Sequence, residues 1–90
     1  MELTIRQYLK FFSKYKEGRI KLRKLFQIAE NEKDITDIEY WLLTYTYAEG
    51  GMVENTCAKL GMSKSTFHNN INVALAKINN TVKRHNIWIL

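Results

Sequence analysis

A single glycine between two stretches of helical periodicity most limits what this chain can form. Gly61 follows a short helical stretch, residues 53–60, and precedes a longer one that extends to about residue 82. Two short helices that meet at a sharp angle through a three- or four-residue turn need a residue with positive φ where the first helix ends. Glycine adopts that conformation at no steric cost. The sequence therefore predicts a sharp turn between two helices at Gly61 and Met62.

The residues around Gly61 meet the other requirements of such a turn. The two helix backbones approach closely there, which favours a small residue, and Cys57 lies four positions before the glycine. Ser63 is placed to cap the second helix with its hydroxyl group. An apolar stripe with helical spacing should then hold the second helix against the core. That stripe consists of Phe67, Ile71, Ala74, Leu75 and Ile78.

The rest of the chain also favours helix. The sequence contains no proline, a residue that helix interiors exclude, and apolar residues recur with helical spacing over residues 3–15 and 19–30. We expect Gly18 to end the first of these helices and residues 31–34 to form a loop. Thr36 and Glu39 form a capping box that opens a third helix, which Gly50 and Gly51 should end. Its expected apolar face holds Trp41, Leu42, Tyr45 and Ala48, with Ile38 beside them. The prediction is an all-α fold, a five-helix single domain with a C-terminal helix-turn-helix.

Length and composition limit the number of domains, the size of the core and the cellular location that we expect. Ninety residues form one small domain with a thin core, and the single cysteine offers no disulfide framework. A lone thiol fits a reducing, cytoplasmic location, and no apolar run approaches the ~20 residues that span a bilayer, so no membrane partner is expected. Three parts are expected: an N-terminal helical pair (residues 1–33) that packs on the motif, the motif itself (34–82), and an apolar tail (83–90).

The tail favours a homodimer. Its last four residues, Ile87, Trp88, Ile89 and Leu90, are all apolar. Burying them between two subunits would cover an exposed apolar patch and would also pair two copies of the predicted helix-turn-helix. The alternative is that they pack on their own chain beside Phe12 and Phe26.

The charge of the chain is divided into three blocks. The net charge of +5 arises from +6 over residues 1–29, −6 over residues 30–56 and +5 over residues 57–90, where no acidic residue occurs. A polyanion should be attracted to the two ends and repelled by the middle. Four bases of the first block, Arg6, Lys10, Arg19 and Arg23, could touch phosphates or simply solubilise their helices.

The central part of the chain resembles a known family. Residues 34–78, DITDIEYWLLTYTYAEGGMVENTCAKLGMSKSTFHNNINVALAKI, are similar to region 4 of bacterial sigma factors and to sigma-like regulators of phages and mobile elements. The matching pattern is a capped helix, a glycine-bearing turn, a short helix with a small central residue, Leu-Gly-x-Ser, a hydrophobic residue four positions on, and Ala-Leu-x-Lys-Ile. The residues that carry it are Thr36, Glu39, Gly50, Gly51, Cys57, Leu60, Gly61, Met62, Ser63, Phe67 and residues 74–78.

Three residues depart from this family pattern. Met52 stands where a capping Ser or Thr is usual, Thr56 replaces an apolar residue, and Cys57 replaces Ala. Residues 1–33 resemble no family that we can name, and the 90 residues do not show the other regions that a complete sigma factor needs. The resemblance therefore implies a double-stranded DNA-binding transcription regulator and not a promoter-opening factor.

The resemblance and the helix-turn-helix geometry together select the candidate DNA-binding residues. The N-terminal part of a recognition helix enters the major groove, and Asn and Lys side chains are suited to adenine and guanine edges. Lys64, Ser65, His68, Asn69 and Asn72 should face outward, while Ser63 and Thr66 should reach phosphates. The competing interpretation is that the asparagines form only a solvated polar face.

Two other functions stay open. A DNA-packaging or replication accessory protein, such as a terminase small subunit, would use the same motif. A module that binds RNA polymerase would use the acidic middle block. An enzyme is not expected, because the sequence shows no nucleophile with a matched base and no phosphate-binding glycine loop. No cofactor is expected, and His68 and His85 lack partners at metal-ligand spacing.

Overall fold

The chain forms helices where its apolar residues recur with helical spacing. The computed structural model describes residues 4–85 and within that range contains five α-helices and no strand. These are α1 (Ile5–Ser13), α2 (Lys16–Asn31), α3 (Asp37–Leu43), α4 (Val53–Leu60) and α5 (Lys64–His85), with a π-helical segment, η1 (Thr44–Ala48), continuing α3. The predicted all-α, five-helix fold is confirmed for these residues. None of the described helices is both long and apolar enough to cross a membrane. The apolar residues 87–90 lie outside the described range.

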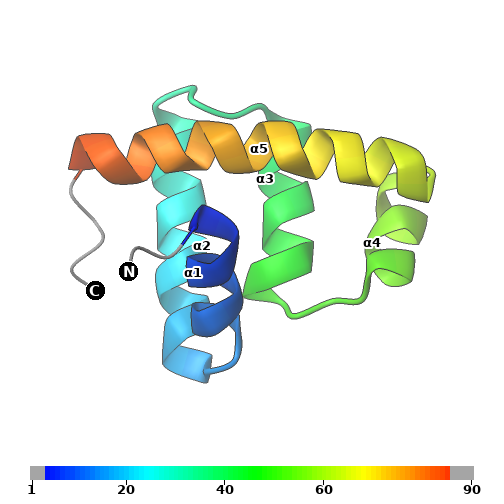
Figure 1. Ribbon diagram of the computed structural model, residues 1–90, viewed down its shortest axis with the longest axis horizontal. Helices are drawn as coiled ribbons and strands as arrows, with labels where there is room; N and C mark the ends of the chain where they lie inside the picture. Colours follow the sequence, from blue (N-terminus) through cyan, green and yellow to red (C-terminus); the bar gives the residue numbers. More distant parts are fainter. Residues whose placement is uncertain (1–3, 86–90) are drawn as a thin grey trace.

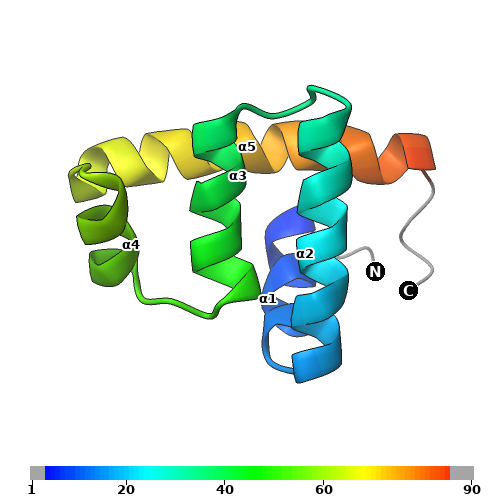
Figure 2. The same ribbon diagram turned by 180° about the vertical axis from the view of Figure 1, so that it is seen from behind.

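Helix α5 is the element on which the others are assembled. It runs along the long dimension of the molecule, and α2, α3 and α4 stand side by side across it (Figures 1 and 2). Helix α1 packs on α2, on the same side of that row as α5, and contacts both η1 and α5. Helix α4 lies at the N-terminal end of α5 (Figure 1). The first turns of α5 are therefore at the edge of the molecule.

The predicted apolar stripe of α5 is confirmed. All five of its residues are buried, and Ile78 is completely so. They meet α2 and α3 residues such as Phe26 and Leu42, which are also fully buried. Because one face of α5 is committed to the core, the opposite face is left to solvent.

The predicted turn at Gly61 is confirmed as well. Gly61 has φ 64° and ψ 41°, which is the left-handed conformation, and the Met62 N–H donates to the Cys57 carbonyl at 3.0 Å. The Ser63 hydroxyl accepts a hydrogen bond from the Thr66 N–H at 3.2 Å, as an N-cap does. Helix α5 extends to His85, the last described residue, and therefore at least three residues beyond the predicted end. We call α4, residues 61–63 and α5 together the α4–α5 unit.

The expectation that Gly18 ends the first helix is wrong. The first break lies at Lys14 and Tyr15, and Gly18 is buried inside α2. A Cβ atom at Gly18 would lie 2.0 Å from the Phe12 carbonyl oxygen. The glycine therefore permits the close approach of α1 to α2.

The expected apolar face of the third helix is partly wrong. Leu42 and Ala48 are buried, but Trp41 and Ile38 are 41% and 49% exposed. The π-helical segment explains part of the difference, since its wider turn, marked by the Glu49 N–H donating to the Thr44 carbonyl at 2.8 Å, alters which side chains face the core. The additional buried side chains are Glu39, Tyr40, Leu43, Thr44 and Tyr47.

Candidate nucleic-acid interface

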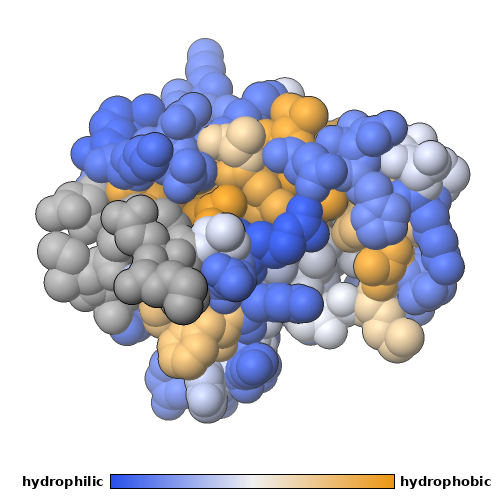
Figure 3. All heavy atoms as spheres, viewed as in Figure 1, coloured by the Kyte–Doolittle hydropathy of each residue, from blue (hydrophilic) through white to orange (hydrophobic). Residues whose placement is uncertain are grey.

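The outward face of α5 carries most of the predicted DNA-binding residues. Ser65, His68, Asn69 and Asn72 are all exposed, and none of them belongs to the core. Asn69 lies between the buried Phe67 and Ile71 in sequence, and projects away from their side. Hydrophilic side chains dominate the end of α5 next to α4, and apolar atoms gather over its middle (Figure 3). The structure therefore brings these four residues onto one accessible surface.

The remaining predicted residues are involved in local contacts where the helix begins. The Ser63 hydroxyl donates to the Thr66 hydroxyl at 3.1 Å in addition to capping the helix. Lys64 Nζ lies 3.1 Å from Glu54 Oε1 of α4, and hydrogen bonds from its own backbone and from Lys64 lower the pKa of the Glu54 carboxyl. Both partners are more than half exposed, so this ion pair contributes little stability and a phosphate could replace the carboxylate.

Asn72 has a partner that the sequence did not suggest. The Arg6 guanidinium, from the first turn of α1, donates to Asn72 Oδ1 at 2.5 Å. The first turn of α1 is itself held by a capping box, in which the Gln7 N–H donates to the Thr4 hydroxyl and the Thr4 N–H to Gln7 Oε1. Helix α1 therefore contributes a positive charge directly beside the outward face of α5.

The positive charge of the C-terminal block is largely neutralised in the folded chain. Four of its five bases pair with acids of the middle block: Lys59 with Glu49, Lys64 with Glu54, Lys77 with Glu39, and Arg84 with Glu32 and Asp34. The charge pattern of the sequence did not indicate these ion pairs between the C-terminal block and the middle block.

Helices α1 and α2 hold the positive charge that is not neutralised. Among residues 4–85, Arg23 is the only base of these helices with a carboxylate within 4.0 Å, that of Glu49. The other bases of the two helices and their junction are Arg6, Lys10, Lys14, Lys16, Arg19, Lys21 and Lys24.

The C-terminal end of α5 is attached to the loop between α2 and α3. The Thr81 hydroxyl donates to Asp34 at 2.7 Å, and Arg84 also pairs with Asp34. Hydrogen bonds from Arg84 and Thr81 lower the pKa of the Asp34 carboxyl. His85 and Arg84 similarly lower the pKa of Glu32. These contacts attach the C-terminal end of α5 to that loop and occupy its charged side chains with acids of the same chain.

Two residues of this surface were not predicted to bind DNA bases. Arg6 is 66 positions from Asn72 in sequence, so no local pattern indicates their contact. Val73 is 50% exposed on α5. It follows Asn69 by one helical turn, and this spacing in the sequence could have placed it on the same face. An exposed methyl-bearing side chain there suits contact with the methyl group of thymine.

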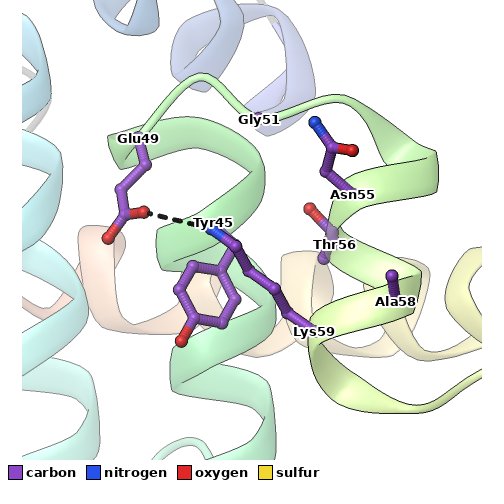
Figure 4. Close-up of a pocket in the computed structure, with 7 residues that line it drawn as sticks. All are labelled: Tyr45, Glu49, Gly51, Asn55, Thr56, Ala58 and Lys59. Atoms are coloured by element: carbon purple, nitrogen blue, oxygen red, sulfur yellow. Dashed lines mark ion pairs between the residues drawn. The ribbon is translucent and has the colours of Figure 1, made fainter.

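A hollow lies between η1 and α4 (Figure 4). Its volume is about 280 Å³. Its charged groups pair with each other, since Lys59 Nζ lies 3.8 Å from Glu49 and 4.5 Å from the centre of the Tyr45 ring. No residue of α5 is among those that line it. It is therefore separate from the surface described above.

No metal site competes with this surface in residues 4–85, where no three His, Cys, Asp or Glu side chains are grouped to hold an ion. Comparison of the chain with models of protein families, with curated proteins and with solved structures gave no match.

Proposed function

We propose that this protein binds double-stranded DNA in a sequence-specific manner and regulates transcription, with the α4–α5 unit acting as a helix-turn-helix. One observation carries the proposal. The first turns of α5 project a row of exposed hydrogen-bonding side chains with no acid among them, and the helix is held there by the left-handed Gly61 and the Ser63 cap. An accessible helix with this chemistry fits the major groove.

Phosphate binding is assigned mainly to the two N-terminal helices. The bases of α1 and α2 are largely unpaired in the described structure, whereas those of α5 are mostly paired. Cationic side chains that are free to meet phosphates supply the salt-dependent, sequence-independent part of DNA affinity. In this arrangement α5 selects the DNA sequence, and α1 binds the phosphates of the flanking DNA backbone.

A matched pair of asparagine variants tests base recognition. Asn69 lies in the second turn of α5, and Asn80 is exposed on the C-terminal half of the same helix. Selection from a random duplex pool first supplies a preferred site. Asn69→Ala should then lose about 1–3 kcal/mol of binding free energy on that site and little on random DNA, if it makes a bidentate base contact.

Asn80→Ala should leave both affinities unchanged, because that position lies beyond the turns that enter the groove. Equal losses on both DNAs for Asn69→Ala would contradict base recognition by α5.

A homodimer is part of the proposal. A single helix-turn-helix contacts only a few base pairs, and a two-fold dimer doubles the half-sites. Light scattering should give the mass of a dimer at tens of micromolar, and deletion of residues 87–90 should give a monomer. A monomeric intact chain would contradict the dimer, and a dimeric truncated chain would place the interface elsewhere.

A protein-binding role is the second candidate, and one observation favours it. Helix α3 exposes Ile38 and Trp41, and the Trp41 ring stacks on Tyr45 with centroids 5.5 Å apart. Exposed apolar side chains on one helix face are typical of protein contacts. Trp41→Ala should preserve DNA affinity and lower the capture of RNA polymerase by the immobilised protein. Unchanged capture would remove this candidate.

A further inference from the structure

The contact between Arg6 and Asn72 determines which hydrogen-bonding groups α5 presents at that point. Arginine has only donors, so the Asn72 side chain must direct its carbonyl oxygen toward the guanidinium, 2.5 Å away. The Asn72 NH2 group is then the part of the amide directed away from Arg6. The orientation follows from the chemistry of the pair and not from a choice between two equivalent amide positions.

The position of Arg6 is set by the start of its own helix. Its own helix begins with a closed capping box, which fixes the backbone of the first turn. The guanidinium also lies close enough to the buried Tyr47 for its charge to matter, since burial raises the pKa of the Tyr47 phenol and the charge of Arg6 opposes that rise. Both Arg6 and Asn72 remain exposed, so they are accessible to a ligand.

The pair therefore presents donors and one positive charge. A bidentate contact of asparagine with adenine needs the amide oxygen to accept from the N6 amino group while the NH2 group donates to N7. Arg6 already uses one of the two lone pairs of that oxygen, and its positive charge would lie beside the N6 donor of adenine. Guanine presents two acceptors, O6 and N7, in the major groove, and thus matches a surface whose free groups are mostly donors.

We propose that Arg6 of α1 and Asn72 of α5 form one recognition unit, the Arg6–Asn72 pair, which selects guanine at the base pair it faces. This inference rests on the proposed DNA binding and adds to it a specificity residue from outside the α4–α5 unit. At Asn72 it replaces the general expectation that an asparagine side chain suits an adenine edge. The alternative is that Arg6 contacts a phosphate or only ties α1 to α5.

The test compares two variants of α1, one at an arginine and one at a lysine, each of which loses one positive charge. Arg6→Gln removes the pair, and Lys10→Gln removes one exposed charge in the next turn of the same helix. Each variant and Asn72→Ala are used in selection from a random-sequence duplex pool and in titrations with the duplex selected by the unaltered chain. Circular dichroism and thermal unfolding check that each variant is folded.

The proposal predicts a shared change at one base position. Arg6→Gln and Asn72→Ala should both remove the preference for guanine at the same position, with affinity for the selected duplex roughly 5- to 150-fold lower. Lys10→Gln should weaken selected and random duplexes by the same small factor, because it loses a phosphate contact only.

Other outcomes would overturn the proposal. If Arg6→Gln and Lys10→Gln have the same effect on both duplexes and base preference is unchanged, Arg6 is a phosphate or structural residue. If the two variants of the pair alter different positions, or if adenine is selected at the shared position, the pair does not act as inferred. These results leave DNA binding intact, whereas failure of the unaltered chain to enrich any sequence would overturn sequence-specific binding as well.

Discussion

Substitution of Gly61 separates backbone strain from steric collision. Gly61 has φ 64°, and a Cβ atom there would meet no atom within 4 Å. The cost of a side chain is therefore the cost of the left-handed backbone, about 1–2 kcal/mol for an ordinary residue. Loss of glycine also reduces the entropy of the unfolded chain and returns roughly 0.4–1 kcal/mol. Taking the middle of each range, Gly61→Ala should thus destabilise the fold by about 0.8 kcal/mol.

The order of the variants is the sharper prediction. Gly61→Asn should cost less than Gly61→Ala, because asparagine tolerates the left-handed conformation, and Gly61→Val should cost most, at least ~1 kcal/mol, because its branched side chain does not. Gly18 supplies the contrast, since a Cβ there would lie 2.0 Å from the Phe12 carbonyl oxygen. At that position Ala should be less harmful than the larger Asn.

Denaturant and thermal unfolding, both followed by far-ultraviolet circular dichroism, measure the stability of the Gly61 and Gly18 variants. A cost of 1 kcal/mol would lower the thermal midpoint by about 4–8 °C in a domain of this size. An unchanged midpoint for Gly61→Ala, or a larger loss for Asn than for Ala at position 61, would refute the reasoning and place the sharp turn elsewhere.

Two further predictions concern buried polar groups. The Thr56 hydroxyl is buried with no hydrogen-bond partner among the described residues, so Thr56→Val should raise the thermal midpoint by removing a group that costs about 1–3 kcal/mol to leave unsatisfied. Thr81→Val is the control and should lower the midpoint, since that hydroxyl donates to Asp34 at 2.7 Å; a gain from both variants would contradict the assignment. Burial tends to raise the pKa of Glu39, but hydrogen bonds from the Thr36 backbone and Lys77 outweigh it and lower the pKa. A lowered pKa gives stability above the unfolded value of about 4.3 that is lost as pH falls. Glu39→Gln should therefore cost about 1 kcal/mol at neutral pH and little in acid, and an equal cost at both pH values in urea titrations would contradict it.

The α4–α5 unit could be predicted because its signals are local. The glycine, the cap and the apolar stripe lie within one stretch of chain, and each acts on its immediate neighbours. Gly61, Ser63 and Phe67 accordingly take the predicted positions. One local signal was not used, the capping box of Thr4 and Gln7, although its Thr-x-x-Gln spacing is visible in the sequence. Because Thr4 is the cap, α1 begins at Ile5, two residues later than expected.

Features that depend on distant contacts could not be predicted from spacing. Gly18 serves the packing of α1 on α2, so its role depends on tertiary structure and not on where a helix ends. The charge blocks could not show that Lys77 and Arg84 pair with acidic residues, because those acids lie far away in sequence. Arg6 reaches the candidate interface for the same kind of reason, through a contact that only the assembled fold creates.

The salt dependence of DNA binding tests the central claim most directly. The affinity of the intact chain for a duplex selected from a random pool is measured at several salt concentrations. If roughly 5–7 phosphates are neutralised, the logarithm of the binding constant should fall against the logarithm of salt with a slope of about −4.5 to −6. A slope near zero, or no measurable binding at low salt, would contradict the account of this protein as a DNA-binding regulator.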